Sequence, residues 1–374
     1  MLSDSCRLKW NRANQQKGNT VKEKKLRVGV VGLGIGTTHL RRYIIHPQAQ
    51  IVAACDADTE RLQSRADEFG IEGLYTSFDE MLAKADLDVC SICTPNFLHC
   101  AMTVKALKAG IHVLVEKPMA MNASEAREMI RCAEKCGKRL MVSFNQRFEK
   151  QHWALKAQVD SGALGEIYYG RTVWHRHRNV PRLGGWFTDK KQSGGGPLID
   201  LGVHRLDLAL WLMGHPDPDW VVGGAFNKLM KDIAREAGKQ STVEDMCVGM
   251  IHFRNGAILE LEASWAGFRP ESDYLSTRLY GTKGGLLASY STSEKQYTCE
   301  LYSREPGGSF SKKLCHPAED PFSPSYHFVD CILKSKPHIA EGKEGLAVQL
   351  ILDALYKSAE SGEAVKIGGG SSSG

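Results

Sequence analysis

The first half of the chain alternates short, nearly unbroken apolar runs with amphipathic stretches of helical period. Such runs are typical of parallel strands covered on both faces, and the stretches between them predict connecting helices. The pattern therefore predicts a doubly wound α/β domain over residues 26–145. The predicted strands are LRVGVV from Leu26, QIVAAC from Gln50, DVCSIC from Asp88, IHVLV from Ile111 and RLMVSF from Arg139, and the predicted helices cover 59–69, 77–84, 97–109 and 123–136.

The pattern changes after residue 146. A helix over 151–160 leads to the strand EIYYGRTVWHRHR from Glu166, then to a loop that ends in three glycines, and then to a helix over 197–213. From Val221 on, strands with alternating polar and apolar positions are separated by turn signals, and a last helix covers 345–359. We therefore expect residues 146–367 to form an α+β domain with a mainly antiparallel, open sheet that binds substrate and carries the subunit contacts.

Composition and charge restrict the function classes. The 374 residues are 42% hydrophobic and 24% charged, and no apolar run reaches the about 18 residues that a membrane-spanning helix needs. Residues 1–25 hold seven Lys/Arg and two Asp/Glu, so their net charge equals the +5 of the whole chain. The remainder is close to neutral, so no nucleic-acid surface is expected.

The ends and the cysteines favour a cytoplasmic protein. Residues 1–25 lack an apolar centre, so they predict a basic, disordered extension rather than a secretory signal, and residues 368–374 predict a flexible tail. The eleven cysteines show no pairing pattern, which favours free thiols in a reducing compartment.

Three glycines follow the first predicted strand directly, in Gly32–Leu–Gly34–Ile35–Gly36, at the start of a helix. Glycines at such a turn let the backbone approach a diphosphate, which the helix N-terminus stabilises. The spacing departs from GxGxxG, because Thr37 stands at the third position. With a strand before it and a helix after it, the loop predicts a dinucleotide site.

The second strand ends at Asp56, where a carboxylate accepts both ribose hydroxyls of NAD and repels the 2′-phosphate of NADP. NAD is therefore the expected cofactor, and Arg61 is the one nearby residue that keeps NADP open. The alternative role of Asp56 is a cap for the helix from Thr59. Further cofactor contacts are expected after the DVCSIC strand, from Thr94, Pro95 and Asn96.

Lys117 follows the IHVLV strand at its carboxyl end, the edge where doubly wound sheets bind ligands. An ammonium that is partly desolvated or close to other cations has a lowered pKa and exchanges protons with a hydroxyl or carbonyl. The alternative is an ordinary surface lysine. Glu116 is expected to contact the nicotinamide ribose or to hold Lys117.

Asp200 and His204 are four residues apart on one predicted helix, so we expect them on one face. A carboxylate beside an imidazole fixes its tautomer and raises its basicity, as a proton-transferring histidine requires. The alternative is a surface pair, or a packed histidine whose hydrogen bonds go to the backbone.

Two long strings resemble the glucose–fructose oxidoreductase/inositol dehydrogenase (Gfo/Idh/MocA) family. They are TPNFLHCAMTVKALKAGIHVLVEKP from Thr94 to Pro118 and GGGPLIDLGVHRLDLALWLMG from Gly194 to Gly214, and the resemblance extends over residues 26–365. The Asn145–Arg147–Phe148 segment between the strings belongs to it as well.

This resemblance implies an NAD-dependent oxidoreductase that transfers hydride to or from a hydroxyl-bearing carbon of a sugar or cyclitol. It implies Lys117 and His204 as the proton-handling pair and Asp200 as a residue that orients them and touches substrate hydroxyls. It also places Arg147 among the cofactor contacts.

The strand from Glu166 carries further candidates. Arg176 and Arg178 are expected to contact sugar hydroxyls, and Trp186 to stack on the sugar. His175 and His177 share one face and form, with Asp200 and His204, a less favoured metal site, so no metal is predicted. Packing is the expected role of His99, Trp174, Trp211, Trp220 and Trp265.

Two other functions stay open. One is a hydrolase or lyase that uses tightly bound NAD to oxidise a glycoside transiently, which would give no net NADH from external NAD. The other is an NAD-sensing protein without catalysis, which the presence of both Lys117 and His204 disfavours. In each case a homodimer or homotetramer is expected, joined largely through residues beyond 220, because an antiparallel sheet with one uncovered face usually finds a partner.

Overall fold

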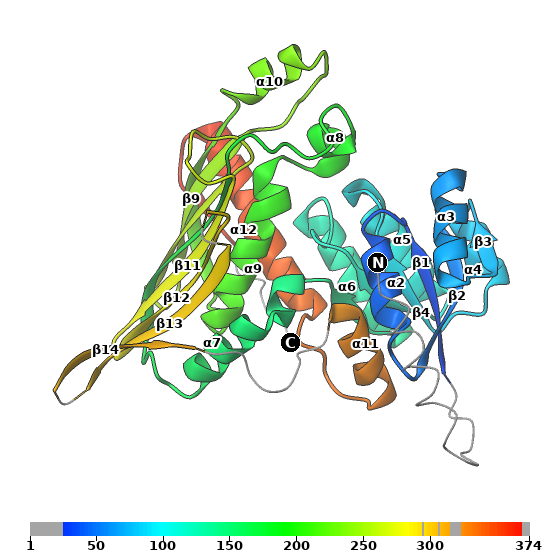
Figure 1. Cartoon of the computed structure of the whole chain (residues 1–374), viewed down its shortest axis with the longest axis horizontal. Coiled ribbons are helices and arrows are strands. Elements are labelled where there is room, and N and C mark those ends of the chain that lie inside the picture. The colour runs from blue at the N-terminus through cyan, green and yellow to red at the C-terminus, as the bar shows by residue number, and fades with distance from the viewer. Residues whose placement is uncertain (1–24, 294, 306, 315–322, 369–374) are drawn as a thin grey trace.

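The computed structural model describes residues 25–293, 295–305, 307–314 and 323–368, so nearly all of the expected N-terminal extension and C-terminal tail lies outside the described residues. The described residues form two β-sheets at opposite ends of the molecule, with helices between them (Figure 1). None of the described helices is both long enough and apolar enough to cross a bilayer.

The N-terminal sheet has six parallel strands in the order β3-β2-β1-β4-β5-β6. This order is that of a Rossmann fold, so the predicted fold class is confirmed for this half. The strands are β1 (Leu26–Val31), β2 (Ala49–Cys55), β3 (Gly73–Tyr75), β4 (Val89–Ile92), β5 (His112–Val115) and β6 (Leu140–Val142). The helices are α2 (Gly36–Tyr43), α3 (Thr59–Phe69), α4 (Phe78–Lys84), α5 (His99–Lys108) and α6 (Ala123–Cys136), with short 3₁₀ turns η1 (Asn96–Leu98) and η2 (Asn145–Phe148).

The C-terminal sheet has nine strands in the order β14-β13-β12-β11-β7-β10-β9-β8-β15, antiparallel except for the central β7–β10 pair. A mainly antiparallel sheet is therefore confirmed. The strands are β7 (Ile167–Arg176), β8 (Pro218–Phe226), β9 (Met246–Phe253), β10 (Ile258–Ser264), β11 (Asp273–Gly281), β12 (Gly284–Ser291), β13 (Gln296–Glu305), β14 (Gly308–Lys313) and β15 (Val365–Lys366).

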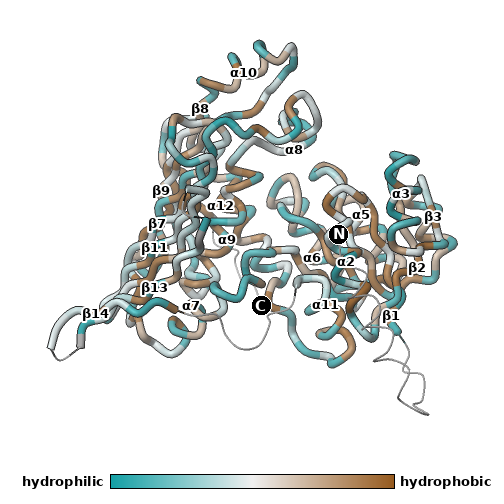
Figure 2. The backbone as a smooth tube through the Cα atoms, in the orientation of Figure 1, coloured by the Kyte–Doolittle hydropathy of each residue, from teal (hydrophilic) through white to brown (hydrophobic). Residues whose placement is uncertain are grey.

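Helices cover one face of this second sheet. α7 (Lys150–Asp160), α9 (Val203–Leu212) and α12 (Gly342–Ser361) lie between it and the N-terminal domain, and in the described part of the chain no helix lies on the opposite face (Figure 1). Polar and apolar residues alternate along the strands, as a sheet with one packed face requires (Figure 2). The remaining elements are η3 (Trp186–Thr188), α8 (Lys190–Ser193), α10 (Met230–Glu236) and α11 (Pro324–Leu333), which packs on α2.

The helix predicted over 197–213 is two elements. A π-helical turn, η4 (Leu198–Gly202), precedes α9, and the N–H of Val203 donates to the carbonyl of Leu198. Such turns change the angular spacing of side chains and occur frequently at functional sites. The wider turn matters here because Asp200 lies in it.

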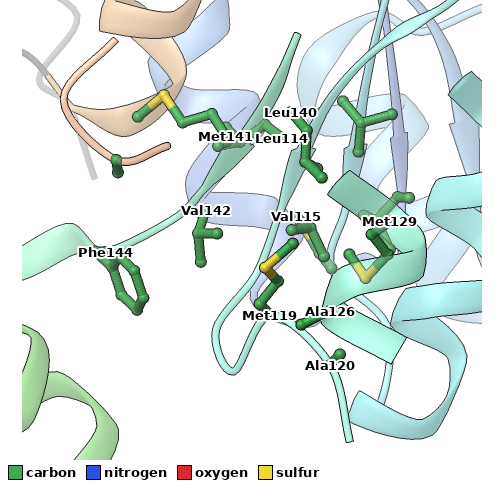
Figure 3. Packing of buried hydrophobic residues seen from close by; sticks show 14 of the residues in the cluster. Leu114, Val115, Met119, Ala120, Ala126, Met129, Leu140, Met141, Val142 and Phe144 are labelled. Carbon is green, nitrogen blue, oxygen red and sulfur yellow. The ribbon is translucent and has the colours of Figure 1, made fainter. Parts of the chain in front are cut away.

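Lys117 stands on a firmly packed segment. Met119 and Ala120, which follow it, are buried in the same core cluster as Val142 of β6 (Figure 3). Helix α12 packs closely against this cluster, since a Cβ on Gly345 would lie 2.7 Å from Sδ of Met119 and 2.9 Å from Cγ2 of Val142. The C-terminal domain thus contributes to the packing that holds the end of β5.

Arg147 lies where the chain leaves the N-terminal sheet and does not line the interdomain cleft, so the structure does not support its predicted contact with the cofactor. Its guanidinium is fully buried and donates to both carboxylate oxygens of Asp207 on α9, at 2.6–3.1 Å, and to Glu344 on α12, at 2.8 Å. Burial opposes ionisation of Glu344, but the hydrogen bond with His215 and the charge of Arg147 lower its pKa to about 2. These ion pairs fix the segment that follows β6 to α9 and α12, all within residues 146–367.

Candidate active site

A cleft of about 910 Å³ lies between the domains. Its size is that of a typical ligand pocket, about 300–1,000 Å³. The predicted site residues that line it are Gly32, Gly34, Ile35, Asp56, Arg61, Thr94, Pro95, Asn96, Glu116, Lys117, Trp186, Asp200 and His204. Gly36, Arg147, Arg176 and Arg178 do not line it.

The glycine loop fits a dinucleotide. Gly32 has a φ of +83°, and a Cβ on it would lie 2.4 Å from the carbonyl oxygen of Cys93. A Cβ on Gly36 would lie 2.9 Å from Val30, so this glycine permits close packing of α2 on the sheet rather than contact with a ligand. Thr37, at the third position of the motif, donates its hydroxyl hydrogen bond to the carbonyl of Leu33 at 2.6 Å. The loop thus presents backbone and the N-terminus of α2 to the cleft.

Asp56 is held at the edge of the cleft and does not cap α3. Its Oδ2 accepts from the N–H of Leu33 at 2.7 Å, whereas the cap of α3 is Asp58. Arg61, the residue that kept NADP open, is paired with both Asp56 and Asp58. A carboxylate beside the glycine loop, with the nearest arginine already engaged, suits the ribose of NAD better than a 2′-phosphate.

Glu116 has a partner that sequence reasoning missed. His39, on α2, places Nε2 at 2.9 Å from Oε1 of Glu116 and Nδ1 at 3.1 Å from Oγ of Ser91. Burial alone would raise the pKa of Glu116, but the hydrogen bond to His39 and the charge of Lys117 hold it below its usual value. His39 and Glu116 are far apart in the chain, and the one available signal was a histidine on the predicted cofactor helix.

Lys117 and Asp200 form an ion pair across the cleft. The ammonium of Lys117 lies 3.2 Å from Oδ1 of Asp200 and 3.1 Å from its carbonyl oxygen. The other carboxylate oxygen, Oδ2, accepts from the indole N–H of Trp265 at 3.0 Å, and the guanidinium of Arg176 lies 3.8 Å away. Trp265 is fully buried, as predicted, but it also fixes Asp200, a role that its apolar surroundings in the sequence did not indicate.

The predicted Asp200–His204 pair does not form. The π-helical turn directs the carboxylate of Asp200 to Lys117 and Trp265, while Nδ1 of His204 is buried without a hydrogen-bond partner among the described residues. Burial first, and then the charges of Lys117, Arg205 and Arg176, lower the pKa of His204 well below 6.5. The imidazole is therefore neutral at physiological pH and can accept a proton.

The residues that were predicted to contact the sugar, Trp186, Arg176 and Arg178, do not all lie in the cleft. Trp186 lines the cleft and stacks on Phe187 with ring centroids 4.0 Å apart. Arg176 lies behind Asp200 rather than in the cleft, and Arg178 is half exposed and paired with Glu236 at 3.3 Å, so a substrate contact from Arg178 is not supported.

The histidines outside the cleft have other partners. His175 lies on the face of the sheet that carries no helix, 3.2 Å from Arg269, so it does not join His204 in a metal site. His99 is fully buried with its ring nitrogens near the carbonyls of Pro118 and Thr94, which agrees with a packing role.

Comparison with known proteins decides the family. The model of the oxidoreductase family with an NAD-binding Rossmann fold matches residues 26–144, and that of the GFO/IDH/MocA C-terminal domain matches residues 152–287. D-glucoside 3-dehydrogenase of Escherichia coli (strain K12) is 33% identical over 91% of this chain and 97% of its own. The chain belongs to the Gfo/Idh/MocA family of oxidoreductases.

Two further relatives show the range of this family. Myo-inositol 2-dehydrogenase of Thermotoga maritima is 26% identical over 91% of this chain and 98% of its own. Among solved structures, GenD2 from gentamicin A biosynthesis in complex with NAD is 26% identical, with a TM-score of 0.77, over 94% of this chain and 99% of that one. The oxidoreductase interpretation is thereby supported over the hydrolase or lyase alternative, and the cofactor is NAD.

The position of Asp56 makes a prediction about cofactor preference. NAD should bind more tightly than NADP. The Asp56→Ala substitution should weaken the binding of NAD by about 10- to 100-fold, which is what the loss of a hydrogen bond to a charged group costs, and should not weaken the binding of NADP. Dissociation constants from quenching of tryptophan fluorescence would measure both. Asp56→Asn is the matched control, because it keeps the shape and an acceptor oxygen while losing the charge. Tighter binding of NADP than of NAD to the unaltered protein would contradict the assignment.

Proposed function

We propose that this protein oxidises a hydroxyl group of a sugar, a glycoside or a cyclitol with NAD⁺, or catalyses the reverse reduction. The observation that carries the proposal is that Lys117, from the end of β5, and His204, from α9, face one cleft beside the dinucleotide loop. The names of the relatives, D-glucoside 3-dehydrogenase and myo-inositol 2-dehydrogenase, support this substrate class.

The two side chains suit two different tasks. The neutral imidazole of His204 accepts the hydroxyl proton of the substrate, since its pKa lies well below 6.5 and the protonated form is disfavoured before the reaction. The ammonium of Lys117, paired with Asp200, donates a hydrogen bond to the same oxygen as negative charge develops on it. NAD⁺, when bound, accepts the hydride.

Asp200 acts on Lys117 rather than on His204. Its carboxylate is fixed from behind by Trp265 and points Oδ1 at the ammonium, so it sets the position of Lys117 in the cleft. The side of Asp200 that faces the cleft is also available to a substrate hydroxyl, as the family resemblance implies.

Variants at these positions test the assignment. Lys117→Ala and His204→Ala should each lower kcat by about 10²- to 10⁴-fold, the usual contribution of a positioned acid–base group, and leave NAD affinity nearly unchanged. Asp200→Asn should be intermediate, because it keeps the shape but weakens the hold on Lys117. Lys105→Ala, at an exposed ion pair on α5, is the matched control.

The assay is NADH absorbance over a panel of sugars, glycosides and polyols, with NADP in parallel. Turnover near that of the unaltered protein in both alanine variants would mean that the chemistry is assigned to the wrong residues. Absence of net NADH with every compound, despite binding of NAD, would favour transient oxidation instead.

We also propose a homodimer or homotetramer joined through the helix-free face of the nine-stranded sheet. This face exposes Phe226 and Tyr280, at 42% and 37%, and carries both signs of charge, with Arg171 close to Glu260 and Glu262. A patch with apolar centres and both signs of charge can be self-complementary about a two-fold axis.

Light scattering tests the assembly. The unaltered protein should be a dimer or tetramer at micromolar concentration, and Phe226→Arg should shift it toward the monomer. Ile45→Arg, at a comparably exposed apolar position in the N-terminal domain, should not. A monomeric unaltered protein would contradict the proposal.

A further inference from the structure

A segment of the C-terminal domain reaches across the cleft to the dinucleotide loop. The guanidinium of Arg182 lies so close to Gly34 that a Cβ on that glycine would be 3.4 Å from Nη2. The same guanidinium lies 5.9 Å from the centre of the Phe187 ring, and both residues line the cleft. An arginine of one domain therefore faces the glycine loop of the other.

Hydrogen bonds fix the conformation of this segment. Arg182 has a φ of +46°, in the left-handed region that non-glycine residues seldom adopt. The turn is closed by the N–H of Gly185, which donates to the carbonyl of Arg182 at 2.8 Å, and by the N–H of Gly184, which donates to the hydroxyl of Thr188 at 2.9 Å. Strained residues held in this way are concentrated at ligand clamps and active sites.

The charge of Arg182 has no counterpart within the described protein. No carboxylate of the described residues lies within 4.0 Å of its guanidinium, whereas Arg61 and Arg178 are both paired. The guanidinium faces the N-terminus of α2, which is the positive end of a helix, and the first turn of α2 holds no acidic residue. Two positive groups that face each other across a cleft favour an anion between them.

We propose that Arg182 binds the diphosphate of NAD from the side opposite the glycine loop. This inference rests on the NAD-dependent function stated above and adds a contact from the other domain to it. A guanidinium offers a planar pair of donors that matches phosphate oxygens, and that of Arg182 lies directly beside Gly34, where a diphosphate on the glycine loop would be in its reach. The same segment carries Trp186 and Phe187, which line the cleft. Binding of NAD to Arg182 therefore also fixes the position of these two side chains.

The test compares three probes on Arg182 variants by isothermal titration calorimetry. NAD and ADP-ribose both contain the diphosphate, whereas adenosine does not. Arg182→Met should weaken the binding of NAD and of ADP-ribose equally, by about 10- to 100-fold, and should leave the affinity for adenosine unchanged. Arg182→Lys should be intermediate, because it keeps the charge and loses the paired donors. Arg178→Met, an arginine of the same segment outside the cleft, should bind all probes as the unaltered protein does.

Two results would overturn the proposal. One is NAD binding to Arg182→Met within about twofold of the unaltered protein. The other is weakened NAD with unchanged ADP-ribose, which would place the guanidinium at the nicotinamide end. Circular dichroism and thermal unfolding show which variants are folded, and Arg182→Gln takes the place of Arg182→Met if the latter is not. Absence of NADH formation by an unaltered protein that binds NAD would count against the proposed reaction, not against this contact.

Discussion

The ion pair between Lys117 and Asp200 is the contact on which the active site depends. Lys117 comes from the Rossmann sheet and Asp200 from the π-helical turn of the other domain, so the pair exists only when the two domains keep their relative position. That position is held by the packing of α12 against α6 and β6, and near this contact Arg147 pairs with Asp207 and Glu344. Removing one partner of a buried ion pair costs about 3–5 kcal/mol, so these charges hold the segment after β6 firmly against α9 and α12.

Charge also decides what His204 can do. Lys117, Arg205 and Arg176 surround it with positive charge, while the carboxylate of Asp200 is directed at Lys117 and Trp265. Burial and these cations disfavour a second proton on the imidazole, and Arg205 itself is buried among neutral partners such as Gln146 and Thr277. The protein thus places a neutral imidazole and a paired ammonium on two sides of one cleft, as the proposed removal of hydride from a hydroxyl-bearing carbon requires.

The features that local sequence encodes were predicted well. Unbroken apolar runs predicted the parallel strands, and alternation predicted the antiparallel sheet. Gly32, Gly34 and Asp56, which were predicted to bind the cofactor, line one cleft. The predictions that the structure does not support depended on the angle between side chains along a helix or on contacts between residues far apart in the sequence. The Asp200–His204 pair assumed a regular helix, and hydrophobic period does not reveal a π-helical turn. Arg147 was assigned to the cofactor on the family resemblance, and its actual partners, Asp207 and Glu344, lie too far away in the sequence to be foreseen.

The missed contacts of the site have the same origin. Trp265 was assigned to the core, where it does lie, but only the folded sheet shows that its indole N–H reaches Asp200. His39 and Glu116 come together because α2 packs on the parallel sheet. Arg182 comes close to Gly34 because the two domains pack against each other. A single sequence shows the residue types at these positions, but it does not show which residues lie next to them in the folded protein.

The dependence of kcat/KM on pH for oxidation of a hydroxyl substrate reports on the protonation state of His204. A neutral His204 must accept the proton, and its pKa is lowered, so the neutral form persists as pH falls below 6.5. We therefore expect kcat/KM to decline only at pH values well below 6.5, and we expect this decline to disappear in His204→Asn while the residual rate is low at every pH. A decline at or above pH 6.5 that disappears in the same variant would show that His204 is not the buried, neutral base described.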